Sequence, residues 1–257
     1  MLEQIVNFFL SFFANPSALG IGLAVYFGAF WLIPYWPPLF TESRLWAVMV
    51  GSAFLALAAA SFIQIPLQFL VGQALGNVWS QEVIMSRILL FGIPQILLSG
   101  LVQEGAKLVP VVLYWRYQGR NLDPKLGLAI GAIAGAGFGI FEAQWVHNTI
   151  FASVNIWEAV QANGLLVLTG FWERFFVVAA HTAFSALAGY GLAKGKGWQF
   201  YLIVSGLHAL LNYGAVLLTS GVLNAIQLEI YVAILALAIA AWALWLRWRK
   251  TAVISEV

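Results

Sequence analysis

The sequence predicts an all-α protein, a polytopic bundle of about seven transmembrane helices. Of its 257 residues, 62% are hydrophobic and only 9% are charged, and the mean hydropathy is +0.90. A soluble chain of this length would need more charge to cover its surface. Nearly the whole chain divides into apolar runs long enough to cross about 30 Å of hydrocarbon. Because these runs leave no room for a separate soluble domain, we expect one transmembrane domain over residues 1–257.

The apolar runs and their flanking residues define the expected elements. Asp123 and Pro124 form an N-cap and first-turn pair for the fourth span. The opening "MLEQIVNFFLSFFANPS" lacks the features of a secretory signal, and we expect a short amphipathic helix at the membrane interface there. The polar stretch "GNVWSQEVIMS" indicates a loop or a surface helix. The predicted spans are 17–36, 44–72, 87–116, 125–150, 165–193, 198–220 and 224–247.

Lys and Arg residues are distributed unevenly between the two ends of these spans. Nine of the twelve fall on the side that a seven-span chain shares with its C-terminus, only Arg87 falls on the other side, and two lie inside spans. Because basic loops stay in the cytoplasm, we expect a protein of the cytoplasmic membrane with its N-terminus outside and its C-terminus inside. We expect the protein to contact membrane lipid and not nucleic acid, and its oligomeric state is left open. The absence of cysteine excludes disulfides, thiolate metal ligands and a cysteine nucleophile.

The fourth predicted span carries glycines at intervals of four residues. Small residues at this spacing form a groove that lets a neighbouring helix approach closely. We therefore expect tight helix packing rather than a ligand-binding loop. The glycines are Gly127, Gly131, Gly135 and Gly139.

Ionisable residues lie inside four of the predicted spans, where burying a charge costs at least a few kcal/mol. At about 1.5 Å per residue, Glu104, His181 and His208 lie near the middle of their spans. Glu142 and the adjacent pair Glu173 and Arg174 lie further toward the outer side. We expect such residues to face one another or a hydrated cavity.

Helical spacing predicts that these polar residues share faces. Residues three or four apart lie on one side of a helix. The pairs at this spacing are Glu104/Lys107, Phe138/Glu142, His181/Ser185 and His208/Asn212. Lys107 as a simple counter-ion of Glu104, and Glu173 with Arg174 as a self-neutralising pair, are structural alternatives. A functional site is favoured, because an apolar core of the same shape would avoid the desolvation cost.

Carboxylates and imidazoles at one depth support two kinds of hydrolytic chemistry. A carboxylate can take the proton of a water molecule while an imidazole or an amide stabilises the oxyanion. Alternatively, Glu104, Glu142, His181 and His208 are candidate ligands for a zinc ion with an open position for water. No HExxH motif favours zinc, so metal- and glutamate-dependent catalysis both stay open. Ser185 as a nucleophile paired with His181 is disfavoured, because residues one turn apart lie along one face.

In chain order, four motifs resemble the signatures of the PrsW-type intramembrane proteases, written EExxK, FxxxE, HxxxS and a late His. The motifs are QEGAK (Gln103–Lys107), FGIFE (Phe138–Glu142), HTAFSALAG (His181–Gly189) and HALLN (His208–Asn212). The "ER" before His181 also resembles the YhfC family of membrane peptidases, and HALLN resembles the HxxxN of the type II CAAX-processing proteases. The resemblance spans residues 100–215, within a motif-bearing core of about 87–220.

This resemblance implies hydrolysis of a peptide bond in a membrane-tethered protein or peptide. Glu104 would then be the water-activating carboxylate or its partner, assisted by Glu142 and His181, with His208 and Asn212 as oxyanion stabilisers. One position departs from the family pattern, because Gln103 replaces its first glutamate. If that position carries the base, the chain would be slow or inactive. The expected supporting residues are Gln103, Lys107, Glu173, Arg174, Ser185 and Asn212.

Two other functions are consistent with the same residues. A catalytically silent scaffold or chaperone of a membrane partner would fit Gln103 and the glycine groove. A proton-coupled transporter would also use buried Glu and His, but it is disfavoured because the sequence shows no internal repeat. Whether Glu142 is catalytic or only pairs with Arg174 is left open.

Overall fold

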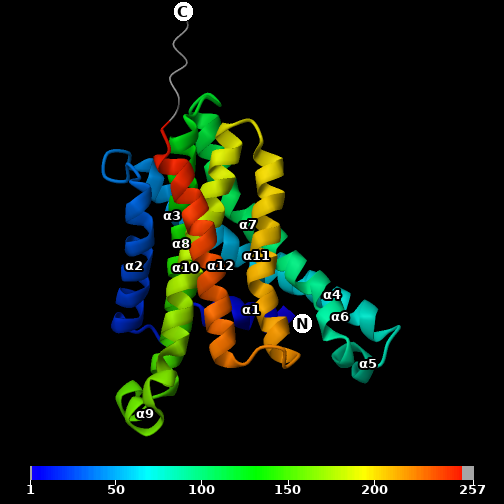
Figure 1. The fold of residues 1–257 in the computed structure, drawn as a ribbon. Helices are drawn as coiled ribbons and strands as arrows, with labels where there is room; N and C mark the ends of the chain where they lie inside the picture. Colours follow the sequence, from blue (N-terminus) through cyan, green and yellow to red (C-terminus); the bar gives the residue numbers. More distant parts are fainter. Residues whose placement is uncertain (1, 251–257) are drawn as a thin grey trace, which may run out of the picture.

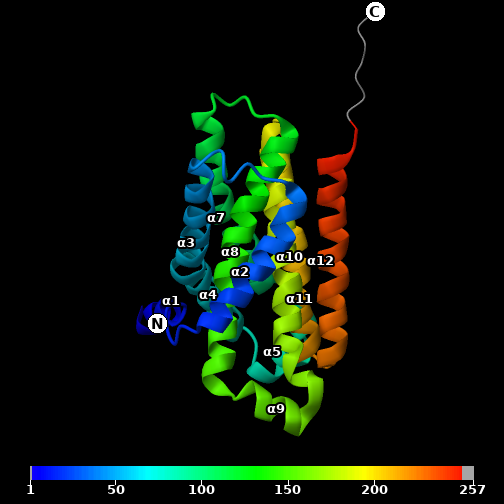
Figure 2. The ribbon, with the colours of Figure 1, turned by 90° about the vertical axis from the view of Figure 1, so that its left-hand side faces the viewer.

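The protein is an all-α bundle with seven helical segments long and apolar enough to cross a membrane. The structure, a computed structural model, describes residues 2–250. Its span-length segments stand side by side, with α9 at one end of the bundle and the visible C-terminal end of α12 at the other (Figures 1 and 2). The segments are Ala18–Tyr35, Arg44–Gly76, Ile88–Tyr117, Pro124–Ser153, Ile156–Ala193, Gly197–Thr219 and Ala225–Trp248. They confirm the predicted fold, and the largest difference is the earlier start of the fifth segment.

The elements in chain order are α1 (Leu2–Ser11), α2 (Ala18–Leu32), η1 (Ile33–Tyr35), α3 (Arg44–Ala59), η2 (Ala60–Gln64), α4 (Ile65–Gly76), α5 (Gln81–Ser86), α6 (Ile88–Phe91), α7 (Ile93–Tyr117), α8 (Pro124–Ser153), α9 (Ile156–Asn163), η3 (Gly164–Leu168), α10 (Thr169–Ala193), α11 (Gly197–Thr219) and α12 (Ala225–Trp248).

Polar side chains define where two of the spans begin. Asp123 Oδ1 accepts two backbone N–H groups of the first turn of α8, at 2.9 and 3.0 Å, and Pro124 occupies that turn as predicted. Asn224 and Gln227 form a reciprocal capping box at the start of α12. Each cap satisfies N–H donors that a helix leaves unpaired at its first turn. The caps therefore set the starts of α8 and α12.

Helices α8 and α10 pack backbone against backbone in the centre of the bundle. A Cβ atom at Gly131 would collide with the carbonyl oxygen of Ser185, and one at Gly135 with the carbonyl oxygen of His181. Such close approach is what small residues at four-residue spacing allow. The predicted tight packing is thus confirmed, and it places the backbone of His181 directly against α8.

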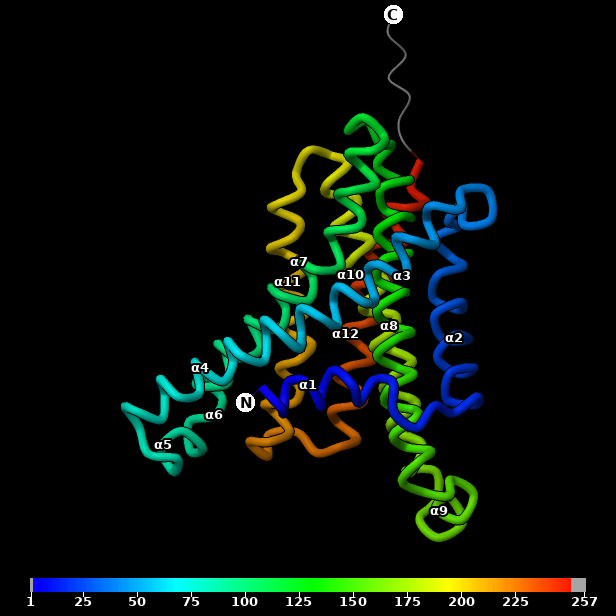
Figure 3. Tube along the Cα trace, turned by 180° about the vertical axis from the view of Figure 1, so that it is seen from behind, coloured from blue at the N-terminus to red at the C-terminus, as the bar shows by residue number. Residues whose placement is uncertain are grey.

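The second and third segments diverge from the bundle at the end that carries α9. Helix α3 continues through the π-helical turn η2 into α4, which has Pro66 in its first turn, and α5 and α6 then lead back to α7 (Figures 1 and 3). Proline and π-helical turns are common causes of such bends. No residue of α4, α5 or α6 is buried. Helix α5 is the surface helix predicted for the polar stretch, and α1 is the predicted short N-terminal helix, lying across the bundle near η2 (Figure 3).

Candidate active site

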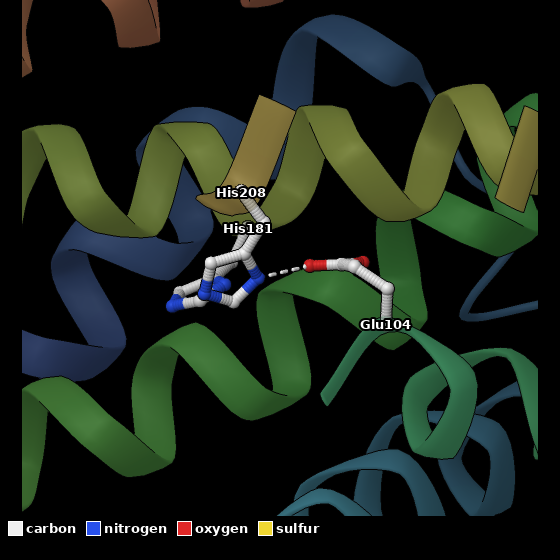
Figure 4. Close-up of side chains that lie close together, drawn as sticks. All are labelled: Glu104, His181 and His208. Carbon is white, nitrogen blue, oxygen red and sulfur yellow. Dashed lines mark hydrogen bonds and ion pairs between the residues drawn. The ribbon is translucent and has the colours of Figure 1, made fainter. Parts of the chain in front are cut away.

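Three side chains from α7, α10 and α11 converge in the interior of the bundle. Glu104 points toward the imidazoles of His181 and His208 (Figure 4), and all three are at most 2% exposed. One carboxylate or ring atom from each lies within 4.8 Å of the others. His208 Nδ1 and Glu104 Oε1 are 2.6 Å apart. The three ionisable residues predicted near mid-depth therefore meet.

Lys107 is the positive charge of this cluster. Its fully buried Nζ donates to Glu104 Oε1 at 2.5 Å and lies 3.0 Å from His181 Nδ1. The three-residue spacing places Lys107 and Glu104 on one face of α7, as predicted. A buried ion pair is stabilised when further donors of the ammonium are also hydrogen-bonded, and here His181 Nδ1 engages a second one. We refer to Glu104, Lys107, His181 and His208 as the central cluster.

One oxygen of the central carboxylate is free. Glu104 Oε1 is bonded to both His208 and Lys107, whereas Glu104 Oε2 is buried without a partner among the described residues. A buried acceptor without a partner costs about 1–3 kcal/mol. Glu104 Oε2 is therefore placed to accept from a water molecule or a ligand.

Glu142 connects the central cluster to a second ion pair. Its Oε2 lies 3.2 Å from His181 Nε2 and accepts a hydrogen bond from Arg174 Nη1 at 3.0 Å. Arg174 Nη2 also donates to Glu173 Oε1 at 2.6 Å. Because His181 Nδ1 faces the ammonium of Lys107, the ring proton belongs on Nε2, where it donates to Glu142. Glu142 thus both pairs with Arg174 and orients His181.

The remaining predicted residues lie around this centre. Gln103 Nε2 donates to Gln64 Oε1 on η2 at 3.0 Å, and Asn212 Nδ2 donates to Ser99 Oγ on α7 at 2.7 Å. Ser185 is buried on α10, and its Oγ bonds to no described residue. Gln103 therefore lies beside the central cluster and is not one of its four members.

A cavity of about 160 Å³ lies beside the central cluster, on the side toward Arg174. The polar groups that line it are Gln103, Glu142, Glu173, Arg174, His181, His208 and Asn212. The expectation that the catalytic candidates share one cavity holds for three of them. Glu104 does not line the cavity, and it adjoins the cavity through its contact with His208.

A family model covers most of this fold. It describes the PrsW family of intramembrane metalloproteases and matches residues 42–243, which include all the helices that supply the central cluster. The chain belongs to the PrsW family. No curated protein and no solved structure matches it. The predicted PrsW resemblance and peptidase class are confirmed, whereas the YhfC and CAAX resemblances stay predictions.

The donor set of this PrsW family member fits a metal ion. Glu104, His181 and His208 supply one carboxylate and two imidazoles, the combination found at some catalytic zinc sites. The unpartnered Glu104 Oε2 adds a free donor atom. Lys107 opposes a metal, because its ammonium already contacts Glu104 and His181. The predicted fourth ligand, Glu142, lies outside this three-residue set and contacts it through His181.

Two ionisable residues near the site were missed in the sequence. His147, the third histidine, is fully buried on α8, and its Nδ1 lies 3.1 Å from the carbonyl oxygen of Gly20 on α2, outside the central cluster. Glu229, five residues into α12, lies within electrostatic range of Glu173 and Arg174. In the sequence, Glu229 is recognisable only as an acidic residue near the start of an apolar span, because the sequence does not show that α12 packs against α10.

Proposed function

We propose that this PrsW family member hydrolyses a peptide bond of a membrane-tethered protein or peptide, with water activated at the central cluster. The observation that carries the proposal is Glu104, a buried carboxylate with one oxygen fixed by His208 and Lys107 and the other free. A structural ion pair would need no free acceptor. A general base needs such an acceptor within hydrogen-bond reach of a water molecule.

The hydrogen bonds support a proposed role for each group. Glu104 Oε2 accepts a proton as the water oxygen attacks the carbonyl carbon, and the same proton then passes to the departing amide nitrogen. Asn212 uses one amide N–H to bind Ser99, which leaves its second N–H to donate to the oxyanion. Lys107 holds Glu104 Oε1 in an ion pair, and Glu142 holds the ring of His181. A metal ion held by Glu104, His181 and His208 would supply Lewis-acid activation of the water.

Loss of the central carboxylate tests this proposal. Wild-type and Glu104→Gln proteins are reconstituted with membranes from cells that lack this chain, and new peptide N-termini are mapped by mass spectrometry. We expect cleavage by the wild type and a rate at least about 100-fold lower for Glu104→Gln, the usual contribution of a general base. His181→Ala and His208→Ala should behave like Glu104→Gln. Glu82→Gln, at an exposed site on α5, is the matched control and should cleave normally. Full cleavage by all three site variants would disprove the proposal.

Chelation of the same preparations separates the two chemistries. If a metal is required, cleavage stops in chelator and returns with added Zn²⁺, and bound metal is reduced in His181→Ala. If cleavage continues undiminished after metal removal, the glutamate-dependent alternative is correct.

A catalytically silent scaffold fits two features, Gln103 and the glycine groove of α8. Gln103 donates to Gln64 and is not a member of the central cluster, which supports the protease over the scaffold. Full retention of a co-purifying membrane partner by Glu104→Gln, without any cleavage by the wild type, would favour the scaffold instead.

A further inference from the structure

Four glutamine side chains form a chain of hydrogen bonds that ends at the cavity beside the central cluster. Gln68 Nε2 donates to the backbone oxygen of Gln95 at 2.8 Å, and Gln95 Nε2 donates to the backbone oxygen of Gln68 at 3.1 Å. Gln64 Nε2 donates to Gln68 Oε1 at 3.4 Å, and Gln103 Nε2 donates to Gln64 Oε1 at 3.0 Å. We refer to Gln64, Gln68, Gln95 and Gln103 as the glutamine chain.

The glutamine chain determines which end of each amide faces its neighbour. A backbone oxygen can only accept, so Gln68 turns its Nε2 toward Gln95 and keeps its Oε1 for Gln64. Gln64 then turns its own Oε1 toward Gln103. If the Gln103 amide turned over, its oxygen would face the oxygen of Gln64, and two acceptors cannot form a hydrogen bond. The Nε2 of Gln103 is therefore directed at Gln64, and its Oε1 is left free for another donor.

Gln103 Oε1 is a buried acceptor at the end of the glutamine chain. It has no partner among the described residues, and Gln103 is only 9% exposed. Gln103 also lines the cavity, together with His208 and Asn212. A buried acceptor without a donor is destabilising, so Gln103 Oε1 is expected to receive a hydrogen bond from a water molecule or a ligand.

We infer that Gln103 binds the substrate, and that its Oε1 accepts a hydrogen bond from a backbone N–H beside the scissile bond. This inference rests on the proposed function and extends it to the form of substrate that the cavity accepts. A backbone N–H inside a helix is already bonded to a carbonyl of the preceding turn. The donor must therefore come from an unwound segment of the substrate, or from the first turn of its helix. Within a membrane such an N–H needs an acceptor that the protein supplies.

Backbone esters test this hydrogen bond. Each peptide has one apolar helix with a Gly-Gly pair near its centre, which favours unwinding, and one amide near the pair is replaced by an ester. The ester removes a single N–H and keeps the side chain. We expect one ester position, outside the scissile bond, at which kcat/KM of the wild type falls about tenfold, as for the loss of one hydrogen bond.

Variants of Gln103 show whether this residue causes the ester effect. At the sensitive position, Gln103→Leu should cleave amide and ester peptides at equal rates, whereas Gln103→Glu keeps an acceptor and should retain the wild-type ratio. Gln81→Leu removes an exposed glutamine from α5 and should also retain the ratio. If the wild type has no sensitive position, or if Gln103→Leu keeps the wild-type ratio, the inference is wrong and Gln103 Oε1 binds only water.

Gln64 is a positioning residue in this scheme, because it bonds to Gln103 and does not line the cavity. In Gln64→Leu the amide of Gln103 can present either its oxygen or its nitrogen, so the ratio of amide to ester rates should fall at least about twofold. Gln64→Glu keeps an acceptor for Gln103 Nε2 and should retain the ratio. A purely structural role would lower both rates in Gln64→Leu without changing their ratio, and that result would contradict the positioning role.

Binding separates failure of this inference from failure of the proposed function. Affinities of the amide and ester peptides are measured with Glu104→Gln, the variant expected not to cleave. Cleavage of every ester peptide at the rate of the amide peptide would leave the proposed function standing and remove the inference. If the amide peptide binds about tenfold more tightly than one ester peptide, and the wild type cleaves neither, the proposed function fails and the hydrogen bond to the substrate stands.

Discussion

Lys107 and Glu104 are 0% and 1% exposed, and both charges lie deep inside the bundle. Removing such a pair from water costs several kcal/mol per ion, and the attraction between them repays this only when the geometry is good and the other donors are bonded. Here Lys107 Nζ contacts Glu104 and His181, and His208 contacts the same carboxylate oxygen. Each member of the central cluster therefore depends on the others.

Removal of one charge should expose this dependence. Lys107→Met leaves the Glu104 carboxylate buried without its counter-ion, and we expect a loss of about 3–5 kcal/mol in the free energy of unfolding. Denaturant titration in detergent measures the change. The double variant Glu104→Gln with Lys107→Met should regain most of this loss, because neither charge is then left alone.

Lys194→Met is the matched control for this prediction. Lys194 is exposed at the end of α10, and its removal should change stability by less than about 0.5 kcal/mol. Wild-type stability in Lys107→Met would show that the ion pair does not hold Glu104 in place.

At the scale of elements, the glycines of α8 determine where α10 lies. The carbonyl oxygens of His181 and Ser185 occupy the space that side chains at Gly135 and Gly131 would need. At this separation the imidazole of His181 contacts Lys107 on α7 and Glu142 on α8. The glycines of α8 therefore affect the candidate active site indirectly, because they determine where the backbone of His181 lies.

Gly135→Ala should disturb both packing and site. The added Cβ collides with the backbone of His181, which cannot rotate away as a side chain can, so we expect a loss of about 1–3 kcal/mol in unfolding free energy. Cleavage should decrease because His181 moves away from Glu142. Gly22→Ala on α2 is the control, since nothing lies within 4 Å of a Cβ there. Equal stability and equal cleavage in both variants would contradict this account.

At the scale of the whole molecule, basic residues mark one end of the bundle. The loops after α7 and α10 lie at the end where the visible chain ends, opposite α9 (Figures 1 and 2). These two loops carry Arg120 and Lys196. The positive-inside rule predicts that this end is cytoplasmic and that α9 lies outside. The cavity beside Arg174 would then lie toward the outer side.

Single cysteines test this orientation directly, because the sequence contains none. Glu158→Cys on α9 should react with a membrane-impermeant maleimide in intact cells, whereas Arg120→Cys and Lys196→Cys should react only after permeabilisation. All three positions are exposed, so access depends on the membrane alone. The reverse pattern would show that the molecule has the opposite orientation.

Local properties of the chain were enough to predict its membrane-spanning helices. Hydropathy and length predicted seven spans, Asp123 predicted the start of α8, and the glycine spacing predicted a close helix contact. The ordered motifs also predicted the PrsW family. These features depend on residues a few positions apart, where helical geometry leaves little choice. The roles of the individual site residues and the extent of a single domain stay predictions.

Only the tertiary structure decided which faces meet. Helical spacing assigns a residue to a face, but it does not identify the helix opposite that face. The sequence therefore could not show that Lys107 reaches His181, that Glu142 contacts both His181 and Arg174, or that His147 lies outside the cluster. It also could not bring Glu229 of α12 within electrostatic range of Glu173 and Arg174, because contacts between distant helices depend on how all the helices pack together.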